Sequence, residues 1–598
     1  MPDVEEQNNE DRDREAESRM TTYSEVDRSK WVACFILLLV NLLNYMDRFT
    51  IVGVMDRLKD FFDMNEKDSG LLQTVFIGFY MIFAPLCGYL GDRYNRKSLM
   101  ICGITIWILA VFLSSFCGRD HYRLFLLCRG IVGIGEASYS TVAPTVLSDL
   151  FSGTQRSQVY MMFYFAIPVG SGLGFISGSR IALLTDSWQW GVRFTPIIGI
   201  LCLVLMAVRL REPARGQSEA AHFQLHDGVE PSIWQDLKYL RSVRTYYLLC
   251  IASIASFFSI GTMSWWTPAF VEYASGVINK VEVVPKEEVA HINLVFGIIT
   301  CASGLLGVAV GSLVSRAWKE GRSVFRHFVS KKADVYICAI SMFLALPFLF
   351  SAIVVAEYSV NGCLVLVFFA IMSMCLNWAV NVDVLMYVVM ANRRAMALAI
   401  QTLVAHMFGD AFSPYLIGAL ADWFRGDDAS THGKFFALQK ALYMPTFMLV
   451  VAGAFFLAAT FFVELDREEA IFQMDAQDRW NNQSPQARLH DDEAPLMRAG
   501  GYPQVVDMVV EEPAPIMNFS PQQQRPSFNS SIDESDDLEK IGSDHEDDDD
   551  DEGDRITVRF ARPVPPPSSQ VFPVSSSLSD EADEWEVQER HTEEDESF

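Results

Sequence analysis

Twelve long apolar segments, separated by shorter polar stretches, dominate the chain between residues 31 and 464. Each is close to the ~20 residues that an α-helix needs to cross the hydrocarbon core of a bilayer. A helix is favoured there because it satisfies every backbone polar group without water. We therefore predict an all-α integral membrane protein with twelve spans: Trp31–Met55, Leu71–Leu90, Leu99–Phe116, Tyr122–Leu147, Val159–Leu184, Phe194–Arg211, Tyr246–Tyr273, Ile292–Val314, Ala333–Val355, Cys363–Met390, Met396–Trp423 and Ala441–Val463.

The spans fall into two groups of six. A polar stretch between the groups predicts an N-terminal half at 31–211, a linker at 212–243 and a C-terminal half at 244–464. Lys and Arg are more frequent in the loops that follow the even-numbered spans. By the positive-inside rule, these loops, the linker and both tails face the cytosol.

The negative charge of the chain is concentrated outside the spans. The formal net charge is -27 although 51% of the residues are hydrophobic, and the C-terminal segment contains the acidic run Asp547–Asp551. The polar segments 1–30 and 465–598 cannot bury enough apolar surface to fold, so we predict two disordered cytosolic tails. The eleven cysteines follow no metal-ligand spacing. We expect no metal, cofactor, nucleic-acid partner or enzymatic activity.

The loop after the second predicted span contains a distinctive group of glycine and charged residues: Gly88, Asp92, Arg93, Arg96 and Lys97. This group resembles the loop signature of the major facilitator superfamily, which implies the major facilitator fold of two six-helix halves. We expect close helix approach at Gly88. The charged residues are expected to form a cluster that caps helix ends and latches one conformation.

A few ionisable residues lie inside the spans of the first half, where each costs at least ~2.5 kcal/mol unless it faces a cavity or a partner. They are Asp47 and Arg48 in the first span and Arg129 and Glu136 in the fourth. Arg129 and Glu136 are separated by nearly two helical turns, so they share a face. We hypothesise that Asp47 and Glu136 bind protons and that Arg129 is their electrostatic partner or a phosphate ligand. A purely structural ion pair is the alternative.

The second half offers fewer candidates. His406 and Asp410 are four residues apart in the eleventh predicted span and therefore share a face. Histidine is the side chain that most readily changes its charge at mildly acidic pH, so His406 is a candidate proton sensor, with a structural hydrogen bond as the alternative. Asp383 and Trp266 are candidate substrate contacts, together with Arg48 of the first half, although Asp383 can equally pair with Arg393.

Three stretches resemble the spinster family of the major facilitator superfamily: Asn44 to Thr50, Arg129 to Thr145, and Asn377 to Ala379. The resemblance covers about Trp31 to Val463 and implies a transporter of lysophospholipids or sphingosine-type lipids. It also implies that Asp47, Arg129 and Glu136 are coupling residues and that His406 and Asp410 belong to the family's motif in the eleventh span. Leu398 departs from the pattern, because an acidic residue is expected after the paired arginines, and this affects head-group choice.

These features lead to a proton-coupled, alternating-access carrier of lysophospholipids or related single-chain lipids that exports them from lysosomes to the cytosol. A plasma-membrane exporter of sphingosine 1-phosphate is the first alternative. A non-transporting membrane scaffold that recruits partners through its acidic tail is the second.

The C-terminal segment contains two short motifs of the kind that sorting adaptors bind. Tyr502 and Val505 fit a tyrosine-based lysosomal signal, and Leu496 ends an imperfect acidic-dileucine motif. We expect a multi-pass protein of the lysosome or late endosome membrane, with the plasma membrane as the alternative location.

Overall fold

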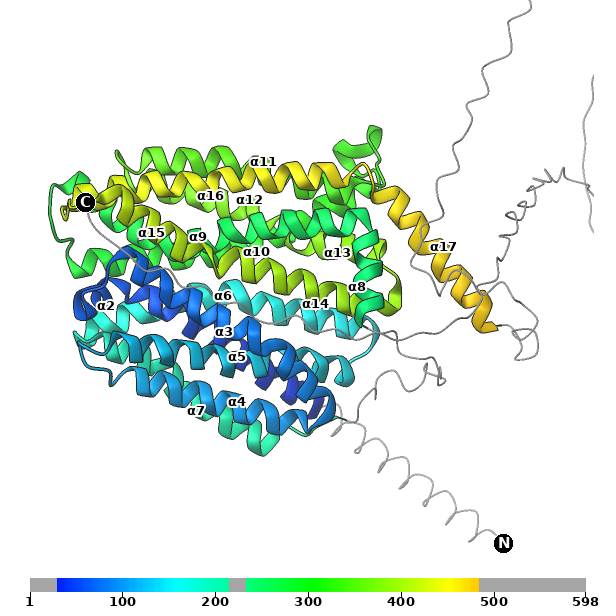
Figure 1. The fold of residues 1–598 in the computed structure, drawn as a ribbon, viewed down its shortest axis with the longest axis horizontal. Helices are drawn as coiled ribbons and strands as arrows, with labels where there is room; N and C mark the ends of the chain where they lie inside the picture. The colour runs from blue at the N-terminus through cyan, green and yellow to red at the C-terminus, as the bar shows by residue number, and fades with distance from the viewer. Residues whose placement is uncertain (1–28, 214–232, 483–598) are drawn as a thin grey trace, which may run out of the picture. The chain divides into compact units, whose positions relative to one another are not determined.

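The fold is that of a computed structural model, which describes residues 29–213 and 233–482. Within these residues the regular structure is entirely helical, and the helices form a bundle of long, roughly aligned rods (Figure 1). The prediction of an all-α membrane protein is confirmed.

The first half begins with the helix Ser29–Gly53, which precedes the label α2. Six further helices complete it: α2 (Met55–Phe62), α3 (Glu66–Arg93), α4 (Arg96–Ser114), α5 (Tyr122–Leu150), α6 (Gly153–Thr185) and α7 (Trp188–Arg209).

The second half contains two spans interrupted within the membrane. Its long helices are α9 (Arg244–Asn279), α10 (Lys286–Lys319), α11 (Ala333–Val355) and α16 (Thr431–Ala459). The tenth span is divided into α12 (Val360–Cys375) and α13 (Trp378–Val388). The eleventh consists of α14 (Arg394–Ala405), a π-helical turn at His406–Asp410, and α15 (Ser413–Arg425).

Eleven helical segments of the described residues are long and apolar enough to cross a membrane. The fourth predicted span, α5, is not among them, although it is 29 residues long and packs between α3 and α4. It contains Arg129 and Glu136, and both are buried. Charged residues that lower the mean hydropathy of α5 therefore face the protein interior, and α5 completes the twelve predicted spans.

The first span and the linker differ in detail from the prediction. The first span ends at Gly53, and a separate helix, α2, starts at Met55. The predicted linker contains a ten-residue helix, α8 (Ile233–Ser242). Neither change was expected, because short amphipathic helices are stabilised mainly by tertiary contacts.

The predicted disordered tail is also partly wrong, because α17 (Val463–Asn482) continues the chain beyond the last span. Its Ala470 is buried, and the carboxylate of Asp466 accepts a hydrogen bond from the backbone N–H of Thr245 at 2.6 Å. That N–H belongs to the first turn of α9, where no intrahelical acceptor exists. Capping and packing therefore order a segment whose composition alone favours disorder.

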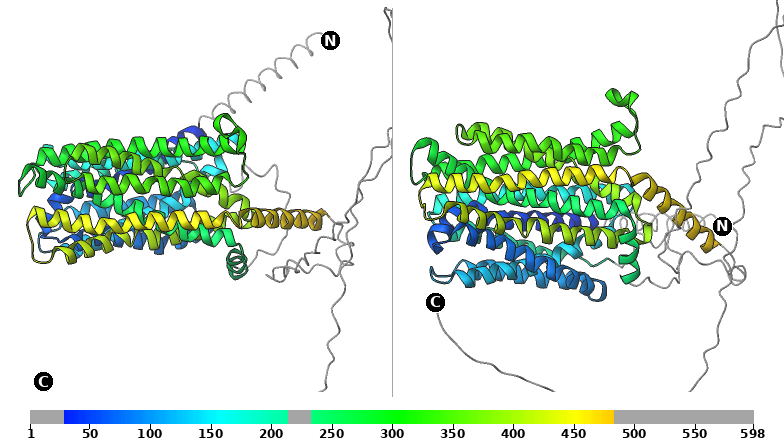
Figure 2. Two further views of the ribbon diagram at one scale, coloured as in Figure 1. Left: turned by 90° about the horizontal axis from the view of Figure 1, so that it is seen from above. Right: turned by 45° about the horizontal axis from the view of Figure 1, so that its top comes forward.

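The two halves lie side by side, the first in blue to cyan and the second in green to yellow (Figures 1 and 2). At the end of the bundle opposite α8, the backbones of α3 and α15 touch. A Cβ atom at Gly70 would lie 2.2 Å from the Pro414 carbonyl oxygen, and one at Gly418 would lie 2.4 Å from that of Glu66. Only glycine permits this approach, so both positions are required for the halves to meet there.

Candidate functional site

Asp47 is buried in the first half, where three other helices, α4, α5 and α7, supply its contacts. It is 2% exposed and accepts hydrogen bonds from Trp107 Nε1 of α4 at 3.0 Å and from Thr195 Oγ1 of α7. Its Oδ2 is 3.8 Å from Nη1 of Arg129 on α5. Asp47 is therefore a buried carboxylate held by two neutral donors and one opposite charge.

Arg129 is buried but only partly paired. It is 1% exposed, and its Nε and Nη2 have no hydrogen-bond partner in the described structure. Its guanidinium lies 5.0 Å from the centre of the Phe76 ring. Buried N–H groups of a charged side chain are costly to leave unpaired. Arg129 therefore has capacity to bind a further anionic or acceptor group.

Glu136 lies two turns along α5 from Arg129, as the spacing predicts. It is 4% exposed, and within the described residues no hydrogen bond or ion pair is made by its carboxyl group. Arg48, Asp47 and Arg129 are close enough to act on it electrostatically. A buried carboxyl group in this setting can respond to small rearrangements by binding or releasing a proton.

Arg48 connects the two halves. Its Nη2 is 3.1 Å from Oδ2 of Asp410, and both side chains are buried. Nδ1 of His406 lies 2.9 Å from Oδ1 of the same carboxylate. With its amide oxygen turned toward Arg48, Gln73 accepts hydrogen bonds from Nη2 and Nε at 3.3 and 3.2 Å. Arg48, expected as a substrate contact, is thus occupied by a partner that the sequence did not indicate.

The π-helical turn explains how His406 and Asp410 reach this position. It widens the helix over five residues between α14 and α15, and its Gly409 packs against the backbone of α9. His406 and Asp410, which were predicted to share a face, are in contact, and the ring centre of Phe257 lies 4.7 Å from that of His406. Such turns frequently occur at functional positions in helices.

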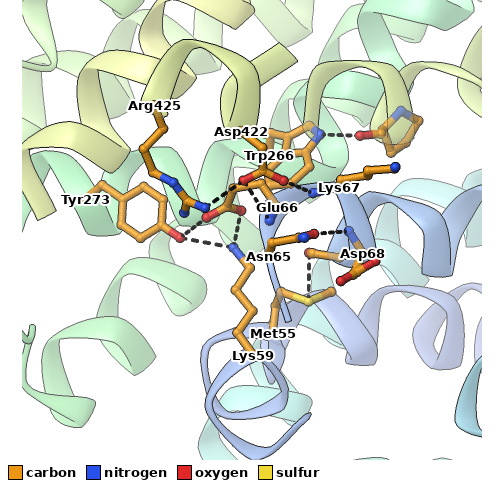
Figure 3. Close-up of polar contacts among 12 residues, drawn as sticks. Met55, Lys59, Asn65, Glu66, Lys67, Asp68, Trp266, Tyr273, Asp422 and Arg425 are labelled. Carbon is orange, nitrogen blue, oxygen red and sulfur yellow. Dashed lines mark hydrogen bonds and ion pairs between the residues drawn. The ribbon is translucent and has the colours of Figure 1, made fainter. Parts of the chain in front are cut away.

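A second polar group joins the halves at the end opposite α8. We call Lys59, Glu66, Tyr273, Asp422 and Arg425 the gate cluster (Figure 3). Nζ of Lys59 donates to Glu66 at 2.5 Å and to the Tyr273 hydroxyl at 3.0 Å, and that hydroxyl donates to Glu66 at 2.7 Å. Lys59 and Glu66 come from the first half and Tyr273 from the second, so these bonds tie the halves together.

The other part of the gate cluster caps a helix across the interface. The carboxylate of Asp422, on α15, accepts hydrogen bonds from the backbone N–H groups of Glu66 and Lys67, at 3.3 and 2.8 Å. These are the first N–H groups of α3, which the helix cannot satisfy itself. Arg425 lies 3.0 Å from Asp422 and orients it.

Trp266 lies beside the gate cluster. It is 1% exposed, its Nε1 donates to the Pro414 carbonyl at 3.1 Å, and Lys59 Nζ is 5.4 Å from its ring centre. A contact with substrate at Trp266 would therefore require this end of the bundle to open. Sequence reasoning missed the gate cluster, because its residues stand at helix ends where charges are ordinary.

An exposed ion pair lies further out at the same end. Asp186, which follows α6, is 2.8 Å from Nζ of Lys286 at the start of α10 and 3.4 Å from Arg57. The hydrogen bond and the charge of Lys286 lower the pKa of Asp186. Because both groups of the pair with Lys286 are largely solvent-exposed, it contributes little to closure.

The expected latch after the second span is only partly assembled. Nη2 of Arg96 lies 2.7 Å from Asp149 of α5, and Lys97 donates to the Ala207 carbonyl at 2.7 Å. Asp92 is exposed, and Arg93 packs on the Tyr89 ring at 4.3 Å.

The close helix approach expected at Gly88 is absent, because a Cβ atom there would meet nothing within 4 Å. The basic residues bind within the first half in this structure, and Asp92 is not one of their partners. The sequence pattern identified the charges correctly as a group but not their pairing, which depends on where α5 and α7 end.

Asp383 does not pair with the arginines that follow it. It is exposed on α13, whereas Arg393 forms an ion pair with Asp236 of α8 at 3.0 Å. The sorting candidates Tyr502, Val505 and Leu496 lie outside the described residues.

Comparison with known proteins shows which family the chain belongs to. The family model described as "Major Facilitator Superfamily" matches residues 37–328. "Protein spinster homolog 1" of Homo sapiens is 41% identical over 438 residues, which is 73% of this chain and 81% of the relative. The chain belongs to the spinster family. It is therefore a member of a family of membrane transporters.

Other spinster relatives are similarly close. The Bos taurus "Protein spinster homolog 1" is 41% identical over 77% of this chain and 85% of its own length. The "Sphingosine-1-phosphate transporter SPNS2" of Danio rerio is 38% identical, over 75% and 87%. A crystal structure of a bacterial homolog of human spinster, in an inward-facing and unoccupied conformation, has a TM-score of 0.61. It covers 73% of this chain and 98% of the bacterial one, and at 16% identity it supports the fold alone.

Proposed function

We propose that this spinster protein is a proton-coupled, alternating-access carrier of lysophospholipids or related single-chain lipids. The observation that carries the proposal is the buried Arg129, two of whose nitrogen atoms have no hydrogen-bond partner in the described residues. Close to it lies the buried Glu136, whose carboxyl group makes no hydrogen bond or ion pair within the same residues. Such groups inside a membrane are expensive unless they serve a substrate or an ion. A phosphate head group or a rearranged carboxylate would satisfy the guanidinium.

The proposed cycle uses the inter-half contacts as its second element. Arg48 and Asp410 join the halves near the middle of the bundle, and the gate cluster joins them at one end. Protonation of Glu136 changes the charge that acts on Arg48 and Arg129, and protonation of His406 changes the charge beside Asp410. Each event would alter how strongly the halves attract each other, which is how proton binding would bias the conformation.

The substrate class is tested by reconstituting the full chain in liposomes with an imposed pH gradient. Labelled lysophosphatidylcholine or sphingosine 1-phosphate is added, and albumin extraction measures how much lipid reaches each leaflet. We expect gradient-dependent movement of lysophosphatidylcholine that stops when a protonophore collapses the gradient. Movement of sphingosine 1-phosphate alone would favour the exporter alternative, which the name of the Danio rerio relative also suggests. Movement of neither lipid by folded protein would contradict the proposal.

We also propose that the protein resides in the lysosomal or late endosomal membrane and that adaptors bind its C-terminal segment. The support is the sequence around Tyr502 and Val505. The Tyr502→Ala variant is expected to accumulate at the plasma membrane, measured by surface biotinylation. Leu496→Ala is the comparison for the second motif. An unchanged lysosomal distribution of both variants would argue against sorting by these motifs.

A further inference from the structure

Helix α8 directly precedes a spanning helix in the chain. It ends at Ser242, and one residue later Arg244 begins the spanning helix α9. It runs across the direction of the spans at one end of the bundle (Figure 1) and is seen nearly end-on in the left view of Figure 2. A helix in this position lies at the level of the lipid head groups.

One face of α8 is attached to the second half. Asp236 forms the ion pair with Arg393, and the Tyr239 hydroxyl accepts a hydrogen bond from the backbone N–H of Met390 at 3.2 Å. The Arg393 guanidinium lies 4.5 Å from the Tyr239 ring centre, and Leu240 is 2% exposed. These contacts fix which side of α8 faces outward, and they involve the segment that leads into α14.

The outward face of α8 combines apolar and cationic side chains at helical spacing. Trp234 is 79% exposed and Leu237 is 37% exposed. Lys238 and Arg241 are exposed as well, and neither has an ion-pair partner in the part of the chain that the structure describes. Trp is favoured at the membrane interface, and paired cations close to it attract anionic lipid.

We propose that this face of α8 binds anionic phospholipid head groups of the adjacent leaflet. Trp234 and Leu237 enter the boundary between head groups and acyl chains, while Lys238 and Arg241 bind lipid phosphate and carboxylate. Charge complementarity and continuity with α9 favour lipid over a protein partner, since a protein would have to displace the surrounding membrane. Through Asp236 and Arg393, bound lipid would hold the start of α14, the helix that leads to His406 and Asp410.

The proposal is tested by hydrogen exchange of the peptide that covers 233–242, in full-length protein in nanodiscs. Nanodiscs of phosphatidylcholine alone are compared with nanodiscs that also contain phosphatidylserine. Two cations at an anionic surface favour the bound state by about 30-fold. Exchange in α8 is therefore expected to slow by up to about that factor when phosphatidylserine is present.

The Lys238→Gln/Arg241→Gln variant should lose this protection. The matched control is Arg326→Gln/Lys331→Gln, which removes two exposed cations from the loop between α10 and α11 at the same end of the bundle. The control should retain the protection of α8. Equal exchange in both nanodiscs would overturn the proposal, as would protection by inorganic phosphate in phosphatidylcholine alone. Protection without phosphatidylserine that the double variant abolishes would assign the face to another occupant, such as an acidic segment of this chain.

Discussion

Replacing Glu136 by glutamine is expected to abolish proton-driven lipid movement while leaving the protein folded. Glutamine has nearly the same shape but cannot exchange a proton, and no described hydrogen bond of Glu136 would be lost. A gradient of one pH unit supplies ~1.4 kcal/mol for each proton that crosses the membrane. This free energy corresponds to about a tenfold ratio of concentrations between the two sides. If one proton accompanies each lipid, wild-type protein should shift the lipid distribution across the bilayer about tenfold per pH unit. The variant should leave it unchanged by the gradient.

Matched variants separate coupling from structure. Glu287→Gln makes the same change at an exposed position at the start of α10 and should behave like wild type. Asp47→Asn removes the countercharge of Arg129, and breaking a buried pair typically costs 3–5 kcal/mol. It should therefore lower the thermal stability, which Glu136→Gln should not.

His406→Ala is expected to keep gradient-driven movement but to change its dependence on pH. Albumin extraction from proteoliposomes measures both quantities. Normal coupling in Glu136→Gln would assign this residue a structural role, and a wild-type pH profile in His406→Ala would remove His406 from sensing.

The second large effect is expected at Gly418, where an alanine should hold open the end of the bundle that carries the gate cluster. Its Cβ atom would lie 2.4 Å from the Glu66 carbonyl oxygen, so α3 and α15 could not approach as they do. Overpacking of this kind typically costs ~1–3 kcal/mol, which corresponds to a population shift of about 5- to 150-fold. Separation of the helices would also remove Asp422 from the N–H groups of Glu66 and Lys67.

Hydrogen exchange of the peptide that covers 64–70 measures this opening. We expect amide hydrogen exchange at Glu66 and Lys67 to accelerate by about 5- to 150-fold, the factor by which the open population rises. Gly78→Ala is the control, because it makes the identical change within α3 at a position where a Cβ atom meets nothing within 4 Å. Its exchange should match wild type. If Gly418→Ala also matched wild type, the close approach of α3 and α15 would not be what closes this end.

In the interior of the first half, the sequence predicts which residues share a helix face but not how those residues pair. The position of Asp47 and the shared face of Arg129 and Glu136 follow from local spacing, since a span places residues seven apart on one side. That two nitrogen atoms of Arg129 have no hydrogen-bond partner in the described residues depends on how α3 and α4 pack against α5. Sequence spacing carries no information on that packing.

The contacts between the halves were beyond sequence reasoning for the same reason. Arg48 and Asp410 are separated by 362 positions, and Glu66 and Tyr273 by 207. Considered locally, Arg48 and Asp410 are charged residues inside spans, and Glu66 and Tyr273 are polar residues near helix ends. Nothing in their local sequence indicates a partner in the other half. Only the packing of the two helical halves against each other decides which of these residues meet.

The sequence by itself determined the helical membrane fold, its division into two halves and its family, because hydrophobic length and short motifs are local properties of the chain. The tertiary structure alone decided the pairing of Arg48 with Asp410, the gate cluster, and the helices α8 and α17. These depend on distant surfaces coming together, and short polar helices form only when such surfaces are available to support them.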